Sequence, residues 1–271
     1  MTGFIPALPP ANEAARLAAV RRSGLMDSEN ISRFDIYTRL FREIARTPIA
    51  YTGLIDEARQ YFLSENFTGC MTGRREVARE DTICQYALRD TRPIIIDDLR
   101  VNPIYHRHAL VTGDPWWVFW AGFPLVTPDG LVLGTLCAVD FEPRKLDEAQ
   151  VDLMRGVAEA MAISIRLQTD QQDALADRTK AVLEDLKASG VTSVDAARDF
   201  LDLCLEHPVT RPDPQLMGTG LIQTGPEGVS LSSSGRSLKT GRGLGPSSFR
   251  VRTSPLRDKA VLDQMFEMLE G

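Results

Sequence analysis

Apolar residues recur every three or four positions in several stretches of the chain, and this spacing predicts helices. The longest stretch runs from Leu146 to about Ala188 and is followed by Gly190, which is typical of a helix end. Shorter apolar runs between turn residues predict strands, and Pro128-Asp129-Gly130 between two of them indicates a hairpin. The expected helices are 11–26, 31–46, 81–90, 146–188 and 194–205, and the expected strands are 49–56, 60–64, 93–97, 119–126 and 131–140.

This order of elements predicts an α+β domain with a central antiparallel sheet and helices packed on it. The domain occupies residues 1–170, and the helical pattern continues as an extension over residues 171–207. Hydrophobic residues make up 43% of the chain and charged residues 25%, which is typical of a globular protein.

The C-terminal part of the chain has a different composition. Gly, Pro, Ser and Thr make up more than half of residues 208–255, so this segment cannot bury enough apolar surface to offset its chain entropy. Seven Lys or Arg stand against one acid in residues 230–259, although the whole chain has a net charge of −6. We therefore expect a flexible basic linker over 208–255, followed by a short amphipathic helix over 256–271.

Other features of the sequence indicate where in the cell the protein is expected. No run of about 18 apolar residues exists, so no membrane-spanning helix is expected. No basic segment precedes an apolar stretch at the N-terminus, so no signal peptide is expected. Four cysteines without the spacing of a metal or disulfide motif predict reduced thiols, and hence a cytoplasmic protein. They are Cys70, Cys84, Cys137 and Cys204.

Four motifs of the first 170 residues resemble those of bacterial GAF domains. The run GLIDEARQYFLS (53–64) is similar to the hairpin xxDxxRQWFxS, and DTICQYAL (81–88) stands where the family has SFCAHAI. The run GDPWWVFWAG (113–122) is similar to GxPxxRFYAG, and LGTLCAVD (133–140) is similar to GTLCVxD. The resemblance covers about residues 10–170. It implies helices on one face of the sheet and loops enclosing a pocket on the other, with sensing of a small molecule, protein interaction and dimerisation as typical roles.

Two departures from the family motifs are informative, because each replaces a polar residue. Tyr86 stands in place of the histidine of SFCAHAI, and Val118 stands in place of the arginine of RFYAG. Losing both polar groups favours an apolar or vestigial pocket, or a protein-binding surface. The residues that the resemblance places at the pocket are Cys84, Tyr86, Trp117, Phe119 and Trp120.

The histidines and cysteines, which are typical residues of catalytic and metal sites, also have structural interpretations. The histidines of His106-Arg107-His108 could supply two metal ligands, but no nearby group completes a site, so a solvated loop is expected. The Cys-His pair of bilin-binding GAF domains is absent, because Gln85 follows Cys84. No phosphate-binding loop, nucleophile elbow or kinase motif is present. We therefore expect no catalytic residue, no metal and no cofactor.

These observations predict a non-enzymatic, bacterial, cytoplasmic regulatory GAF-domain protein that docks a protein partner. The basic tail is the expected interaction segment, through Arg250, Arg252, Leu262, Phe266 and Leu269. One alternative is a sensor that binds an apolar small molecule in the GAF pocket, and another is a thiol-dependent enzyme that uses Cys84. A homodimer through the helix at 146–188 is also expected, without membrane contact or specific nucleic-acid recognition.

Overall fold

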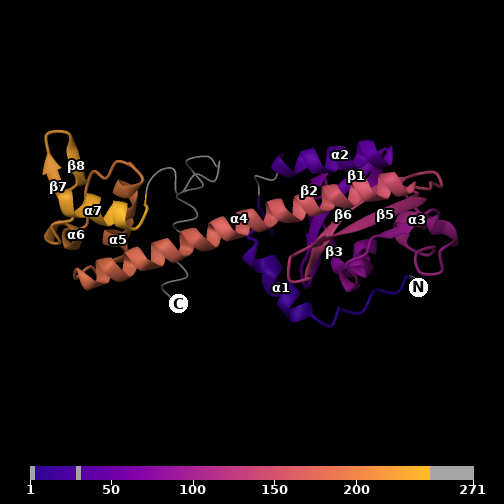
Figure 1. Cartoon of the computed structure of the whole chain (residues 1–271), viewed down its shortest axis with the longest axis horizontal. Helices are drawn as coiled ribbons and strands as arrows, with labels where there is room; N and C mark the ends of the chain where they lie inside the picture. The colour runs from indigo at the N-terminus through magenta and orange to yellow at the C-terminus, as the bar shows by residue number, and fades with distance from the viewer. Residues whose placement is uncertain (1–3, 29–31, 245–271) are drawn as a thin grey trace. The chain divides into compact units, whose positions relative to one another are not determined.

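The structure is a computed structural model that describes residues 4–28 and 32–244. The chain divides into two compact units, Met1–Thr169 and Asp170–Gly271, and the boundary falls within the long helix α4 (Glu148–Ala188). Figure 1 shows the elements of both units along the chain.

The first unit contains a six-stranded sheet in the order β3-β2-β1-β6-β5-β4, in which every neighbouring pair is antiparallel. The strands are β1 (Ile49–Ile55), β2 (Arg59–Glu65), β3 (Glu76–Ala78), β4 (Ile94–Ile96), β5 (Phe119–Val126) and β6 (Val132–Asp140). The predicted antiparallel α+β architecture is therefore confirmed. The hairpin of β5 and β6 lies where Pro128-Asp129-Gly130 indicated it.

Helices cover one face of this sheet. They are α1 (Glu13–Arg22), α2 (Asp35–Ala45), which follows the short 3-10 helix η1 (Ser32–Phe34), and the first half of α4. Phe41 of α2 and Met154 and Met161 of α4 pack with Phe119 and other inward-facing residues of the sheet in one buried cluster. These side chains bury the apolar stripes whose spacing predicted the helices.

A buried arginine fixes the lead-in helix α1 to the sheet. The Arg16 side chain is fully buried, and its guanidinium donates to the carbonyl of Ile55 and to both carboxylate oxygens of Glu13. Glu13 also accepts a hydrogen bond from Arg79. Burial raises the pKa of Glu13, but the hydrogen bonds from Arg16 and Arg79 outweigh it and lower this pKa to about 2.

Short helices and loops cover the opposite face of the sheet. They are the 3-10 helices η2 (Gly69–Met71), η3 (Arg79–Asp81), η4 (Ile83–Arg89) and η5 (Leu99–Val101), and the one-turn helix α3 (Ala109–Thr112). The helix expected over 81–90 is η4, and the Thr82 hydroxyl caps it by accepting from the amide of Cys84. Beneath these elements lies a second buried cluster that includes Tyr51, Trp117 and Trp120.

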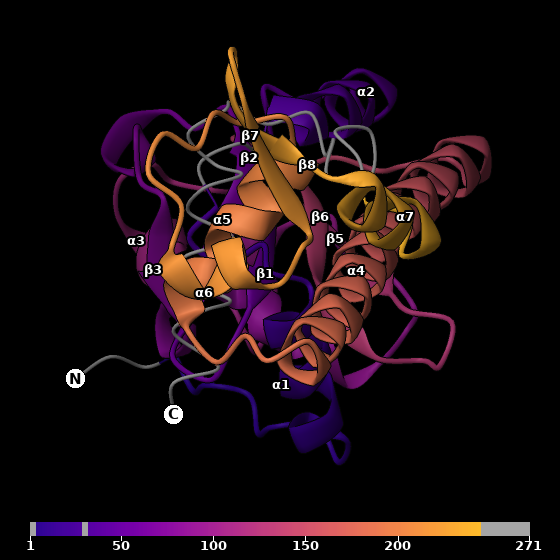
Figure 2. The same cartoon turned by 90° about the vertical axis from the view of Figure 1, so that its left-hand side faces the viewer.

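The second unit has its own core. It contains the end of α4, α5 (Val194–Cys204), α6 (Pro214–Gly218), the hairpin of β7 (Ile222–Gly225) and β8 (Gly228–Leu231), and α7 (Ser233–Gly241) (Figure 2). Val182 and Leu186 of α4 pack with Phe200, Leu216 and further apolar residues of these elements.

This unit corrects the expectation of a flexible linker for residues 208–244. The polar residues that suggested a linker serve as turn and cap residues instead. Asp213 caps α6, Ser232 caps α7, and Gly228 adopts a φ of 106° where β8 leaves the hairpin turn. The remaining part of the expected linker and the expected amphipathic helix at 256–271 lie outside the described residues. Among the described residues, no helix combines the length and apolar character needed to cross a membrane.

Candidate functional site

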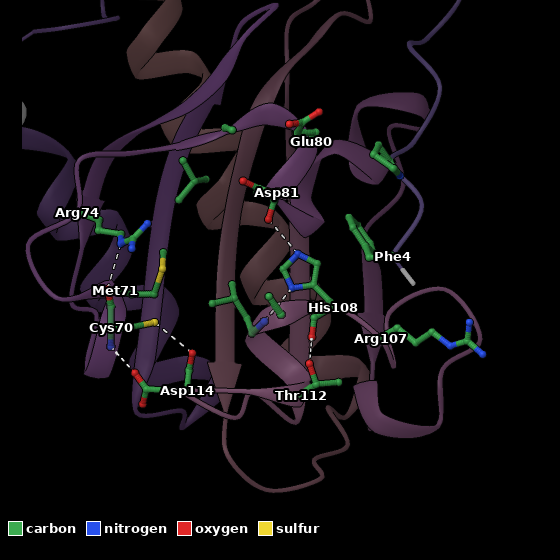
Figure 3. Close-up of a pocket in the computed structure, with 15 residues that line it drawn as sticks. Phe4, Cys70, Met71, Arg74, Glu80, Asp81, Arg107, His108, Thr112 and Asp114 are labelled. Atoms are coloured by element: carbon green, nitrogen blue, oxygen red, sulfur yellow. Dashed lines mark hydrogen bonds between the residues drawn. The ribbon is translucent and has the colours of Figure 1, made fainter. Parts of the chain in front are cut away.

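A hollow of about 980 Å³ lies in the first unit, beside the short helices (Figure 3). Its walls come from three separate parts of the chain: the N-terminal segment, the loop and strand around residues 70–81, and residues 107–114. Met71, Val77 and Leu110 contribute apolar surface. Charged residues also line the hollow, namely Arg74, Glu80, Asp81, Arg107 and Asp114.

Asp114 connects two of these walls. Its carboxylate accepts a 2.7 Å hydrogen bond from the amide of Cys70, and its carbonyl accepts from the Cys70 thiol at 3.1 Å. Arg74 adds a 3.1 Å bond from Nε to the carbonyl of Cys70. Gly69 has a φ of 64°, and a Cβ there would lie 3.0 Å from the Asp114 carboxylate, so the contact depends on glycine. These bonds fix the shape of the hollow on this side.

His108 is held in one orientation on the other side. Its Nδ1 accepts from the amide of Leu110 at 3.1 Å and thereby caps α3. Nε2 must then carry the proton, which it donates to the carbonyl of Asp81 at 2.9 Å. The sequence predicted a solvated loop here, but the His108 side chain is buried. Burial lowers the pKa of His108. His108 is therefore a neutral structural residue. In the described ranges, no group of three or more His, Cys, Asp or Glu could hold a metal ion.

The N-terminal segment is attached to the rim of the hollow. The Tyr86 hydroxyl donates to the carbonyl of Ile5 at 2.6 Å, and the amide of Ala7 donates to Gln85 Oε1 at 2.9 Å. The Phe4 ring meets the His108 ring edge-on, with centroids 4.5 Å apart. No sequence signal could reveal these contacts, because they join residues about 80 to 100 positions apart.

The five residues expected at the pocket do not form a common cavity. Cys84, Trp117 and Trp120 lie in the buried cluster under the short helices, and Tyr86 holds the N-terminal segment. Phe119 lies in the cluster on the opposite face of the sheet, because successive residues of β5 alternate between faces. None of the five lines the hollow.

Aromatic rings fill the space beneath the short helices. Tyr51 stacks on Trp117 with centroids 5.9 Å apart and contacts Phe67 at 4.9 Å. A chain of polar groups runs through the same cluster: Trp120 Nε1 donates to the Tyr51 hydroxyl at 3.2 Å, and that hydroxyl lies 3.1 Å from Cys84 Sγ. Because Tyr51 accepts from Trp120, its own proton is available to the sulfur of Cys84.

Comparison with known families and curated proteins gives two matches. The GAF domain family matches residues 33–166. A protein of Pseudomonas aeruginosa named cyclic di-GMP phosphodiesterase is 30% identical over 212 residues, which cover 74% of this chain and 35% of that protein. This chain thus spans about a third of the length of that relative. A match that covers 74% of the chain spans about 200 residues. Even if it began at residue 1, it would end near residue 200, so it includes the whole of α4.

This relative corrects one expectation from the sequence. We predicted a non-enzymatic protein, because no catalytic motif was found, and the relative is named as an enzyme. The expectation rested on motifs of this chain alone, whereas the named activity belongs to a relative of which this chain spans about a third.

Solved structures include similar GAF domains. The blue-light absorbing form of the PixJ GAF domain of Thermosynechococcus elongatus is 20% identical, with a TM-score of 0.43, and covers 58% of this chain and 93% of its own. The GAF-B domain of DevS from Mycobacterium smegmatis is 17% identical, with a TM-score of 0.40, and covers 52% and 95%.

Proposed function

Residues 33–166 belong to the GAF domain family, and on this basis we propose that the domain receives a signal and passes it to an output through α4 in a dimer. The observation that carries this proposal is a second apolar stripe on α4, which the first unit leaves exposed. Leu153, Ile163 and Leu167 are 60%, 59% and 57% exposed, respectively. With the exposed residues Ala149, Gly156 and Ala160, they alternate at spacings of four and three residues.

This alternation is the heptad pattern of helices that pair in a coiled coil. The buried stripe of the same helix, with Met154, Ala158, Met161 and Ile165, packs in the core of the GAF domain. The first half of α4 therefore contacts the domain on one face and offers an apolar surface on another. A change in the packing of the domain would alter how this surface is presented.

The partner that we propose for the stripe is a second copy of this chain, paired in parallel. In a parallel pair, the flanking residues Asp152 and Glu159 would face Val157 and Ser164 of the other copy. No like charges oppose each other in this arrangement. Gly156 and Ala160 are small and would let the two helices approach closely.

The output that we propose is the turnover of cyclic di-GMP. Support comes from the relative named a cyclic di-GMP phosphodiesterase, whose match extends through α4 and beyond the GAF domain. A helix shared with such a protein is the element expected to couple a GAF domain to its activity.

The signal that we propose is a small polar molecule bound in the hollow. Charged side chains line the hollow on both sides, with Arg74 and Arg107 as cations and Glu80, Asp81 and Asp114 as acids. A ligand there would therefore need polar groups, in contrast to the apolar ligand expected from the aromatic residues of the sequence. Native mass spectrometry of the protein isolated from its host tests this point: a bound mass lost in Arg74→Ala supports it, and the bare chain mass contradicts it.

Protein docking by the basic C-terminal segment is a further part of the proposal. Arg250, Arg252, Leu262, Phe266 and Leu269 lie outside the described residues. The support is the charge of this segment, which is opposite to that of the rest of the chain. A partner captured by the full chain and lost when Arg250 and Arg252 are changed to Glu would support this role.

Light scattering after gel filtration tests the dimer. We expect the wild-type chain to have twice the chain mass, and Ile163→Glu to have the mass of one chain, because a carboxylate would be buried in the pair. Val101→Glu is the matched control, since Val101 is 80% exposed and lies outside the stripe. A wild-type monomer at micromolar concentrations would contradict the proposal.

The cellular concentration of cyclic di-GMP tests the output. It is measured by mass spectrometry in cells that lack the chain and in cells supplied with wild type, Ile163→Glu or Val101→Glu. We expect wild type and Val101→Glu to shift the concentration in the same direction, and Ile163→Glu to leave it at the level of the deletion. Equal concentrations in all four strains would rule out this output.

A further inference from the structure

Two cysteines from distant parts of the chain meet in the core of the first unit. Cys84 lies on η4 and Cys137 lies on the central strand β6. Their sulfurs are 3.6 Å apart, and both side chains are fully buried. A disulfide needs a sulfur separation of about 2.05 Å, so closure requires a movement of only about 1.5 Å.

The groups around the pair favour ionisation of one sulfur. The Tyr51 hydroxyl lies 3.1 Å from Cys84 Sγ, and Cys137 Sγ lies 3.6 Å from Cys84 Sγ and 3.1 Å from the Thr135 hydroxyl, so the proton of Cys137 can turn towards Cys84. Burial raises the pKa of Cys84, but hydrogen bonds from Cys137, Thr135 and Tyr51 outweigh it and lower this pKa to about 6. Burial raises the pKa of Cys137 well above its ordinary value. Ionisation of Cys84 alone gives a thiolate next to a protonated thiol, which is the arrangement that thiol oxidation requires.

We propose that Cys84 and Cys137 are a redox modification site, which forms a reversible disulfide when the protein meets a hydroperoxide. The Cys84 thiolate attacks one peroxide oxygen, the O–O bond breaks, and hydroxide leaves, which gives a sulfenic acid on Cys84. The sulfur of Cys137 then attacks that of Cys84, the S–O bond breaks, and the departing oxygen takes up the proton of Cys137 as water. With hydrogen peroxide, the released hydroxide takes up the proton that Cys84 lost on ionisation. Two electrons thus pass from the two sulfurs to the peroxide, which is reduced to two molecules of water.

The position of η4 lets the oxidant reach Cys84, and it links the disulfide to the N-terminal segment and the hollow. Hydrogen bonds in a 3-10 helix are of poorer geometry than in an α-helix, so η4 opens more readily than the sheet beneath it. Gln85 and Tyr86 of η4 hold the N-terminal segment, and Glu80 and Asp81 just before η4 line the hollow. A bond from Cys84 to β6 therefore changes the attachment of the segment at the rim of the hollow.

The wild-type chain contains its own controls for this reaction. Cys70 is exposed and reports that the peroxide has reacted with an accessible thiol. Cys204 is buried in the second unit, where burial raises its pKa to about 12. Cys204 therefore reports whether burial alone protects a cysteine from oxidation by the peroxide.

The test treats the folded chain with graded hydrogen peroxide, blocks the remaining thiols with a maleimide under denaturing conditions, and maps the peptides by mass spectrometry. We expect a cross-linked peptide that joins Cys84 and Cys137, reversible by dithiothreitol, while Cys204 stays reduced. The same product is expected in Cys70→Ser/Cys204→Ser, which keeps only the two cysteines of the pair. If Cys70 is fully oxidised while Cys84 and Cys137 remain free, or if Cys84 ends as a sulfinic acid, the proposal is overturned. A second readout is the rate of amide exchange in residues 4–8, which we expect to change after oxidation. An unchanged rate would show that the disulfide does not affect the attachment of the N-terminal segment at the rim of the hollow.

Discussion

The hydroxyl of Tyr86 donates a 2.6 Å hydrogen bond to the backbone carbonyl of Ile5. Tyr86 is one of the two positions at which a polar residue of the GAF motifs is replaced. The Tyr86 side chain therefore holds the N-terminal segment. The shorter histidine of the family motif would not make this contact in the same way. The segment in turn places Phe4 against His108 at the hollow.

Tyr86→Phe should loosen this segment without unfolding the domain. The variant keeps the ring contacts with Phe4 and Tyr105 and loses one hydrogen bond, which contributes about 1 kcal/mol. We expect faster hydrogen exchange of the amides in residues 4–8, measured by mass spectrometry. Tyr61→Phe is the control, since it removes a similar bond to the carbonyl of Ser28. Equal exchange of residues 4–8 in both variants would show that Tyr86 does not hold the segment.

The neutral state of His108 predicts a pH dependence of stability. Burial lowers the pKa of His108 in the folded chain, whereas the unfolded chain keeps a value of about 6.5. The unfolded state therefore binds more protons below about pH 6.5, and stability is lost as the pH falls through this value towards the folded pKa. His108→Asn keeps a side-chain acceptor for the cap of α3 and cannot titrate.

Urea unfolding at pH 7 and pH 5 measures this difference. Tryptophan fluorescence reports the first unit alone, because the three tryptophans are Trp116, Trp117 and Trp120. We expect wild type to lose more free energy of unfolding between the two pH values than His108→Asn does. The same loss in both proteins would show that His108 is not the group responsible.

Two glycines of the first unit should respond in opposite directions to the same substitution. A Cβ at Gly134 would lie 2.0 Å from the carbonyl oxygen of Gly53 on the neighbouring strand, whereas a Cβ at Gly156 on α4 would meet nothing within 4 Å. Gly134→Ala should therefore lower the free energy of unfolding by about 2–3 kcal/mol through overpacking. Gly156→Ala should raise it by about 1 kcal/mol through helix propensity. Urea unfolding monitored by tryptophan fluorescence checks both, and a stable Gly134→Ala domain would contradict the strand spacing.

Elements with a local, periodic signal could be predicted from the sequence. The hairpin of β5 and β6 and the long α4 follow from apolar spacing and turn residues that are close together in the chain. The second unit could not be predicted in this way, because Ser and Gly residues such as Ser232 and Gly228 suggested a linker and proved to be caps and turns.

The hollow could not be predicted from the sequence for another reason. Its walls depend on contacts between distant residues, such as Cys70 with Asp114 and Phe4 with His108. Alternation along β5 separates Phe119 from Trp120, so a run of aromatic residues in the sequence does not form one wall.

Covalent trapping of the α4 pair tests the central claim most directly. Ile163→Cys is prepared in a Cys70→Ser background, which removes the exposed native thiol, and is oxidised with copper phenanthroline. In a parallel pair, position 163 of one copy faces position 163 of the other, so we predict a disulfide-linked dimer at low micromolar concentration. Val101→Cys in the same background should form no covalent dimer, because Val101 is exposed outside the stripe. Absence of the position-163 dimer, or equal cross-linking at positions 163 and 101, would contradict pairing through the exposed stripe of α4.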